Sequence, residues 1–347
     1  MTPFLLALVS IVTYGLTHIL RRYALDKGVL DVPNSRSSHS VPTPRGGGLA
    51  FVAVYIVFVC AGSTWLGMNL RVLAGMVIGG SMIALVGWFD DRKSLSVRTR
   101  VIVHLLSAAL AVYCLGGLPE IRLGTATVGL GALGSVAATL ALFWSVNLYN
   151  FMDGIDGIAG TEGVMVCGTA GMLALLQGKI AFAYLCFGLA SSVLGFLILN
   201  WQPAKIFMGD VGSGFLGFVV MYLAIWSERS AVLPMTTWVI LLSVFLVDAT
   251  VTLVRRMLSG ERWSEPHRSH VYQLAVQAGY SHKQVTGAVA LLNALLGVMA
   301  LASLRTDRMV VPLLLSVGVS LLLLYWYLSR RWSLQRERGL SEGARMD

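Results

Sequence analysis

The feature that most constrains this chain is a series of long apolar runs that recurs from one end to the other. Eleven such runs, most of them about long enough to cross the hydrocarbon layer of a membrane as a helix, are separated by short polar connections. Only 12% of the residues are charged, about half of the usual share in soluble proteins. Because lipid leaves no partner for unpaired backbone groups, this pattern predicts an all-α polytopic membrane protein.

The apolar runs follow one another without a linker, repeat or low-complexity segment. We therefore predict a single membrane domain over residues 1–347. All four cysteines lie inside apolar runs, which favours buried thiols over disulfides or metal ligands. The expected spans are 3–20, 47–66, 71–89, 98–116, 127–148, 158–177, 180–199, 213–227, 232–254, 285–303 and 309–328.

The distribution of basic residues predicts how the chain is oriented. With the N-terminus outside the cytoplasm and eleven spans, the C-terminus lies inside, and the cytoplasmic segments hold 20 of the 26 Lys and Arg residues. The other side keeps six, so the positive-inside rule favours this arrangement. The dense polar motifs then all fall on the cytoplasmic side, and we expect an active site built from cytoplasmic loops.

The richest polar stretch is Asn147 to Gly157, Asn-Leu-Tyr-Asn-Phe-Met-Asp-Gly-Ile-Asp-Gly. Spacing by three places Asn147, Asn150 and Asp153 along one helix face, and Asp156 follows after a glycine. Such oxygen-bearing groups at a membrane edge are costly unless they bind something. A polar helix end in a solvated loop is the alternative.

Two further motifs lie nearer the N-terminus. The loop 31–48 holds Arg36, His39 and Arg45 before three glycines, and these side chains could meet phosphate oxygens. Asp90-Asp91-Arg92-Lys93 ends the third run, and adjacent carboxylates followed by cations suit Mg²⁺ with a phosphate. The alternatives are a positive-inside loop and a charged helix terminus.

Two more motifs follow in the second half of the chain. Phe207-Met-Gly-Asp210-Val-Gly-Ser is a glycine-rich turn with one carboxylate at the start of a span, where backbone amides favour anions. Residues 255–284 form the largest cytoplasmic loop and contain His267-Arg268-Ser-His270, a set that can hold a pyrophosphate. Within the spans, His18 and His104 are expected to be structural, and Asp248 to be structural or to support the site.

Five motifs in this order identify a resemblance that covers nearly the whole chain. They are Pro-Thr-Pro-Arg-Gly-Gly-Gly, Asp90-Asp91, Asn147-x-x-Asn150-x-x-Asp153-Gly-x-Asp156-Gly, Phe207-Met-Gly-Asp210-x-Gly-Ser and the His-Arg-x-His loop. The chain resembles the polyprenyl-phosphate N-acetylhexosamine-1-phosphate transferases, a glycosyltransferase family 4 type, and within them the bacterial O-antigen initiating enzymes. The resemblance implies a multi-pass protein of the bacterial cytoplasmic membrane.

The resemblance also implies the reaction and its partners. A UDP-N-acetylhexosamine gives its sugar-1-phosphate to undecaprenyl phosphate, UMP leaves, and a cell-envelope polysaccharide is begun. The expected cofactor is Mg²⁺, with Mn²⁺ as the alternative. Membrane lipids are expected partners, nucleic acid is not, and a homodimer is open because dimers occur in the family. GlcNAc and deoxy sugars such as FucNAc or QuiNAc remain alternatives for the donor.

Roles for single residues come from the same resemblance. Asp210 and Asn150 are implied as Mg²⁺ ligands, with Asp90 and Asp91 close to the metal and the acceptor phosphate. The resemblance implies that Asn200, Phe207 and Asp156 bind the uridine. It also implies that His270 and Arg268 bind the pyrophosphate. The remaining candidates are Asp153 for catalysis and Asn147 and Arg45 for substrate. One departure is that Tyr272 and Gln273 stand where many members carry two further histidines.

Two mechanisms are open at this point. An aspartate could attack first and form a covalent phosphosugar, or the lipid phosphate could attack directly. We favour direct attack, because a phosphate monoester is already mostly a dianion at neutral pH and needs charge screening more than a base. A transporter of an anionic solute is the alternative from another class, and it should place polar groups on broken helices at mid-membrane.

Overall fold

The computed structural model describes residues 3–33, 41–261, 267–306, 308 and 310–343, with side chains as far as Trp332. Arg36 and His39 of the first loop lie outside the described residues, as do residues 262–266 of the largest loop. The described part is almost entirely helical, as the apolar runs predicted.

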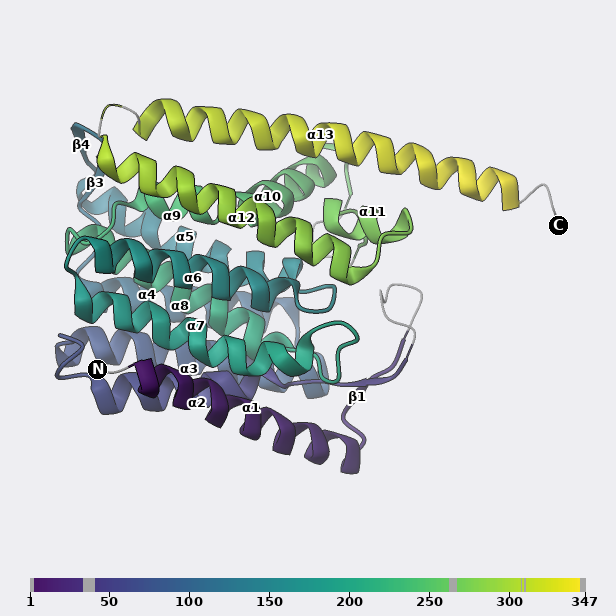
Figure 1. The fold of residues 1–347 in the computed structure, drawn as a ribbon, viewed down its shortest axis with the longest axis horizontal. Coiled ribbons are helices and arrows are strands. Elements are labelled where there is room, and N and C mark those ends of the chain that lie inside the picture. Colours follow the sequence, from purple (N-terminus) through teal and green to yellow (C-terminus); the bar gives the residue numbers. More distant parts are fainter. Residues whose placement is uncertain (1–2, 34–40, 262–266, 307, 309, 344–347) are drawn as a thin grey trace.

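Thirteen helices are present in the described residues, and most run side by side in one bundle (Figure 1). They are α1 Pro3–Asp26, α2 Gly48–Gly62, α3 Leu70–Lys93, α4 Val97–Leu115, α5 Gly131–Met152, α6 Ile158–Leu176, α7 Ile180–Asn200, α8 Asp210–Arg229, α9 Met235–Leu241, α10 Ser243–Leu258, α11 Val271–Gln277, α12 His282–Arg305 and α13 Val310–Gly343. Two antiparallel strand pairs complete the fold: β1 Leu30–Asp31 with β2 Thr43–Pro44, and β3 Glu120–Leu123 with β4 Ala126–Gly129.

Nine of the described helices are long and apolar enough to cross a membrane, and α9 with α10 makes up to ten. This confirms a multi-pass, all-α membrane protein. The one remaining expected span, 47–66, corresponds to α2, which has only 15 residues. The full count of eleven and the orientation therefore remain predictions.

The span expected at 232–254 is not one straight helix. It consists of α9 and α10, which meet at Leu242 and are bent by 76°. Neither proline nor glycine stands at the bend, so the bend could not be predicted from residue type. The hydroxyl of Ser243 donates to the carbonyl of Val239 at 2.6 Å, a back-bond that is typical of bent helices.

Helix α8 lies at the centre of the bundle and packs against α2, α3 and α5. Glycines allow these close approaches, as is common between membrane helices. A Cβ atom on Gly48 would lie 2.4 Å from the Cα of Gly212, and one on Gly87 would lie 2.5 Å from the carbonyl carbon of Asp210. The last turn of α3 is thereby held directly against the first turn of α8.

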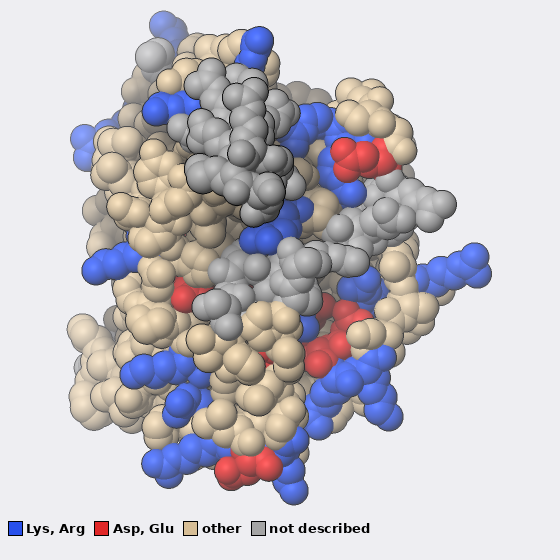
Figure 2. Space-filling view, turned by 90° about the vertical axis from the view of Figure 1, so that its right-hand side faces the viewer, with Lys and Arg blue, Asp and Glu red and all other residues tan. Residues whose placement is uncertain are grey.

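The loops that carry the five motifs meet at one end of the bundle. Figure 1 shows α11 and β1 at this end, with the hairpin of β3 and β4 at the opposite end. Figure 2 looks onto the first of these ends and shows many Lys and Arg side chains around a smaller number of Asp and Glu. The fold therefore gathers polar groups that are far apart in the sequence.

Candidate active site

The carboxylates at the junction of α3 and α8 form the centre of the candidate site. Asp91 accepts hydrogen bonds from the backbone amides of Asp210 (2.9 Å) and Val211 (3.2 Å), and its side chain is only 5% exposed. Its two oxygens thus bind the first turn of α8. Asp91 lies beside the predicted metal ligand Asp210, but it faces the backbone of that residue.

Asp90 and Asp210 bring their side chains into contact with each other. Asp90 also accepts from Arg100 at 2.9 Å and from the backbone amide of Leu95. The amide of Asn150 reaches both Asp210 and the hydroxyl of Ser213, the latter at 3.3 Å. The structure therefore brings together Asp90, Asp210 and Asn150, as the motifs predicted.

Two arginines face these carboxylates. Arg45 reaches Asp91 with Nε at 2.8 Å and Asp210 with Nη2 at 2.7 Å. Burial alone would lower the pKa of Arg45, but the carboxylates of Asp210 and Asp91 raise it above its ordinary value. Arg100 holds Asp90 and lies 4.0 Å from Asp210. The guanidinium group of Arg45 therefore stays charged, and the two arginines together offset part of the acidic cluster.

Sequence reasoning missed Arg100 except as one more cytoplasmic cation. It lies in the first turn of α4, where the helix dipole disfavours a positive charge. A cation in that place was the available signal that a carboxylate partner was near.

Asp153 follows the last residue of α5 and is half-buried. Burial, followed by the nearby charge of Asp210, raises the pKa of Asp153 well above its usual range, although Arg45 opposes the shift. Asn147 lies two turns before Asp153 on α5, and its side-chain nitrogen donates to the carbonyl of Phe143 at 2.7 Å. Both residues lie near the carboxylate cluster without joining its hydrogen bonds.

A cavity of about 490 Å³ lies over the cluster. Its polar lining comes from separate segments of the chain and consists of Asp90, Arg100, His104, Asn147, Asn150, Asp210, His267, His270 and Gln273. Apolar side chains of α3, α4, α5 and α10 form the rest of the wall, among them Val97, Phe143, Trp144 and Leu253. A charged floor with apolar walls suits a ligand that joins an anionic head to an apolar chain.

The histidine loop contributes unequally to this cavity. His267 and His270 line it, with their ring centroids 4.8 Å apart, whereas Arg268 is not among the lining residues. Burial, with the neighbouring His270 and Arg256, lowers the pKa of His267 to about 4. Gln273, which stands at one of the two replaced histidine positions, lines the cavity as well.

The residues expected to hold uridine form a second group beside the cluster. Asn200 accepts from the amide of Gly157 at 3.1 Å and donates to the carbonyl of Ile206 at 3.0 Å. Asp156 accepts from the amide of Ala204 at 3.0 Å, and the backbone amide of Phe207 donates to Pro44 at 2.8 Å. The bonds of Gly157 with Asn200 and of Asp156 with Ala204 join the loop 153–157 to the loop 200–209. The bond from Phe207 to Pro44 joins the second loop to β2.

His282 in the first turn of α12 was missed by sequence reasoning. Its Nδ1 lies 3.3 Å from a carboxylate oxygen of Asp156, and the hydroxyl of Thr286 donates to the carbonyl of Asp156. α12 is thereby fastened to the same loop.

The donor set agrees with Mg²⁺, which takes hard oxygen ligands and usually shares one or two carboxylates with substrate phosphates. Asp90 and Asp210 are two carboxylates in contact, with the amide of Asn150 beside them. Within the residues that the structure describes, no three His, Cys, Asp or Glu side chains form a complete metal-ligand group. The residues present therefore fit an ion that is held jointly with a phosphorylated ligand.

The fold and site define a class: a multi-pass membrane protein whose helix ends gather carboxylates, amides and cations around an amphiphilic cavity. Residues 73–228 match the model of glycosyl transferase family 4, and the likeness to known transferases extends over most of the chain.

Its relatives include a "probable undecaprenyl-phosphate N-acetylglucosaminyl 1-phosphate transferase" of Bacillus subtilis, 29% identical over 303 residues, which are 86% of this chain and 83% of the relative. Undecaprenyl-phosphate alpha-N-acetylglucosaminyl 1-phosphate transferases of Yersinia pestis and Escherichia coli K12 are each 27% identical. The first match covers 92% of this chain and 89% of the relative, and the second covers 91% and 88%.

Proposed function

We propose that this protein transfers GlcNAc-1-phosphate from UDP-GlcNAc to undecaprenyl phosphate, releases UMP and so begins a cell-envelope polysaccharide. The observation that carries the proposal is the contact of Asp90, Asp210 and Asn150 on the floor of a cavity with apolar walls. The names of the relatives supply the lipid and the sugar. A deoxy sugar in place of GlcNAc is the variant of this proposal that the assay below also tests.

The chemistry is a phosphoryl transfer. An oxygen of the lipid phosphate attacks the β-phosphorus of the nucleotide sugar, the bond from that phosphorus to the bridging oxygen breaks, and UMP leaves with the bridging oxygen. Asp210 and Asn150 would hold Mg²⁺, which screens the charge of the reacting phosphates. Asp91 fixes the first turn of α8, so that Asp210 keeps its position.

The remaining residues take roles that follow from where they lie. Asp90, on the cavity floor beside Arg100, orients the acceptor phosphate, and the apolar wall accommodates the first part of the prenyl chain. Arg45 offsets the charge of Asp210 when no substrate is present. We place His270 against the pyrophosphate, and Phe207 against the uracil ring with Asn200 and Asp156 shaping that loop.

A transfer assay tests the proposal. The purified full-length chain is incubated with undecaprenyl phosphate, Mg²⁺ and radiolabelled UDP-GlcNAc, UDP-FucNAc or UDP-QuiNAc, and both lipid-linked sugar and UMP are measured. We expect the two products in equal amounts with UDP-GlcNAc. Formation of UDP instead of UMP, or no lipid product with any donor, contradicts the proposal. EDTA should abolish transfer and Mg²⁺ or Mn²⁺ should restore it.

We further propose that the chain is one domain in the bacterial cytoplasmic membrane, with eleven crossings, the N-terminus outside and the motif-bearing end in the cytoplasm. The bias of Lys and Arg supports this orientation. Single cysteines at Ser94 and Lys205, in a background without the native cysteines, should be labelled only from the cytoplasm. Labelling of either position from the periplasm in intact cells would reverse the assignment. A homodimer stays compatible with the proposal and is tested by the mass of the purified protein.

A further inference from the structure

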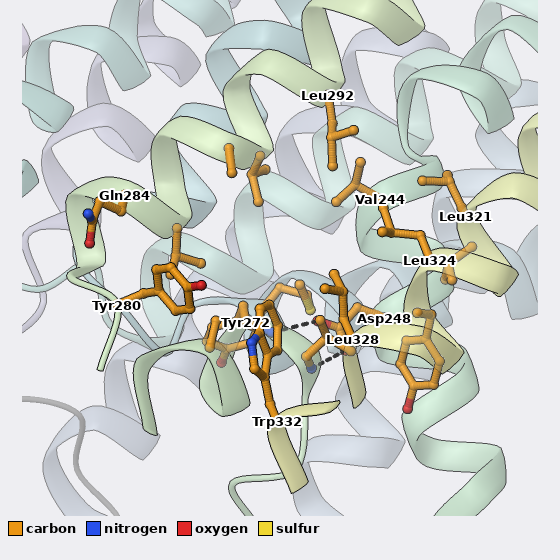
Figure 3. Close-up of a pocket in the computed structure, with 18 residues that line it drawn as sticks. Val244, Asp248, Tyr272, Tyr280, Gln284, Leu292, Leu321, Leu324, Leu328 and Trp332 are labelled. Carbon is orange, nitrogen blue, oxygen red and sulfur yellow. Dashed lines mark hydrogen bonds between the residues drawn. The ribbon is translucent and has the colours of Figure 1, made fainter. Parts of the chain in front are cut away.

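Asp248 on α10 is a buried carboxylate to which the proposed reaction assigns no role. It is 7% exposed, and its Oδ1 accepts from the amide of Val271 at 2.9 Å and from the hydroxyl of Thr252 at 3.2 Å. Its Oδ2 accepts from the amide of Tyr272 at 3.2 Å. Figure 3 shows Asp248 among the apolar side chains of a pocket between α10, α11, α12 and α13. A carboxylate in such surroundings is costly and is therefore a functional candidate.

The same carboxylate also contacts the candidate site through one side chain. Nδ1 of His270 lies 3.3 Å from Oδ1 of Asp248, and the imidazole ring is 3% exposed. Asp248 lines the apolar pocket and His270 lines the cavity over the acidic cluster, so the pair bridges the two. Asp248 itself is not among the residues that line that cavity.

This geometry fixes the orientation of the imidazole. A carboxylate beside Nδ1 offers an acceptor for a proton on that nitrogen and leaves Nε2 as the nitrogen that can meet a ligand. When the ring carries both protons, Nδ1 donates to Asp248 and Nε2 can donate to a phosphate oxygen. The rings of Phe151 and Tyr272, with centroids at 6.2 Å and 5.8 Å, restrict its rotation further.

We propose that Asp248 is the positioning residue for His270: it holds the imidazole so that Nε2 donates a hydrogen bond to the substrate pyrophosphate during transfer. This inference rests on the proposed function. The competing explanation is that Asp248 only caps the N-terminus of α11 by accepting from the amides of Val271 and Tyr272. In Asp248→Asn the amide oxygen can still accept from the backbone amide of Val271, but the amide nitrogen cannot accept from that of Tyr272, so the change removes the charge and one bond of the cap.

The experiment is a double-mutant cycle of Asp248→Asn and His270→Ala in the full-length chain, with kcat and KM for UDP-GlcNAc and the melting temperature measured for each variant. We expect Asp248→Asn to lower kcat by about ten- to a hundredfold with KM changed less than about threefold, as for other carboxylates that orient a functional histidine. The double variant should be no slower than His270→Ala alone. Losses that multiply in the double variant, or an Asp248→Asn enzyme at wild-type speed, overturn the inference.

Two controls separate this result from a folding defect and from failure of the proposed function. Thr252→Val removes one donor to Asp248 together with the hydrogen bond between Thr252 and Tyr325. It should lower kcat a few-fold in the wild-type background and not at all in His270→Ala; equal losses in both backgrounds contradict the inference. Glu228→Gln alters a buried carboxylate that accepts from a helix-end amide at the opposite end of the bundle, and it should leave kcat unchanged. If the wild-type chain transfers no sugar phosphate, the proposed function fails; if it does and His270→Ala is as fast as wild type, only the present inference fails.

Discussion

The two ends of the bundle use the same chemical groups in opposite ways. At the end with the β3–β4 hairpin, Glu228 is 4% exposed and accepts from the backbone amide and the Nε of Arg122, at 3.0 Å and 2.9 Å, and from the amide of Met235. One carboxylate is matched there by one arginine. At the motif-bearing end, within the residues that the structure describes, Asp90, Asp91 and Asp210 pair with Arg45 and Arg100, and Asp153 lies near them.

This difference between the two ends indicates two roles for charged residues at helix ends. The Glu228 pair satisfies both partners and joins α8 to the hairpin and to α9, which is a structural role. In the acidic cluster, the carboxylates of Asp90 and Asp210 are in contact and repel each other when both are charged. A bound cation or proton relieves this repulsion. The paired charges of Glu228 and Arg122 thus hold the bundle together at one end, and the carboxylates in contact at the other end support the ligand site that we propose there.

The largest effect should come from Asp210→Asn. This change removes the carboxylate that contacts Asp90, Asn150 and Arg45, and we expect transfer to fall by at least about a hundredfold, the order seen when one strong electrostatic contact to a reacting group is lost. The melting temperature is measured alongside, because the same change relieves the contact with Asp90 and also removes the ion pair with Arg45. Near-normal turnover of a folded Asp210→Asn protein would remove Asp210 from the metal site.

A smaller effect is expected from Phe207→Ala. If the ring stacks on uracil, its loss should weaken nucleotide-sugar binding by roughly 1–3 kcal/mol, the usual worth of base–aromatic stacking. Trp65→Ala is the matched control, because Trp65 is a half-exposed aromatic residue in the connection between α2 and α3 that packs against Tyr184. Affinities for UDP-GlcNAc and for lipid decide the matter: a change confined to the lipid would show that Phe207 anchors the loop in the membrane.

Glu228→Gln should change stability and spare activity. Glutamine cannot carry the charge that pairs with Arg122, so we expect the free energy of unfolding to fall by about 1–3 kcal/mol, as for a lost bond to a charged group. Thermal unfolding and transfer rate are measured on the same sample. A loss of turnover comparable to that of Asp210→Asn would contradict the purely structural role that we assign to Glu228.

The smallest effect concerns pH at the motif-bearing end. The pKa of His267 is lowered from 6.5 to about 4, mainly by burial, so between these values the unfolded chain binds this proton more readily than the folded one. The contribution of His267 to stability is therefore complete above about pH 6.5 and is lost as the pH falls toward 4. Melting temperatures at pH 5 and pH 7 should differ less in His267→Gln than in wild type. An identical pH dependence in both proteins would show that this ring does not titrate as proposed.

Much of the fold could be predicted because the bilayer imposes it. Long apolar runs must become helices in lipid, so the helices α3 to α8 lie close to the spans expected for them. The bend at Leu242 could not be predicted, because its visible cause is one hydroxyl bond from Ser243 and no proline or glycine marks it. The 15-residue length of α2 was equally hidden, since apolar residues continue the run past Gly62.

The candidate site was predictable as a set of residues and less so as an arrangement. Spacing and residue type pointed to Asp90, Asp210 and Asn150, which the structure brings into contact. The partners that orient such groups come from distant segments and carry no local pattern. Three such pairs could be recognised only from the packing of the helices. They are Arg100 with Asp90, His282 with Asp156 and Asp248 with His270.

The shortness of α2 has a consequence for where the reaction takes place. Fifteen helical residues extend about 22 Å, whereas the hydrocarbon layer is about 30 Å thick. The amides of Gly47 and Gly48 at its start donate to Phe207 and Met208, which binds the two site loops to this short helix. If α2 crosses the membrane as we propose, the bilayer must thin around it, or these loops must lie below the membrane surface. Arg45 would then lie near the depth of the lipid headgroups, where a lipid phosphate could reach it without its chain leaving the membrane.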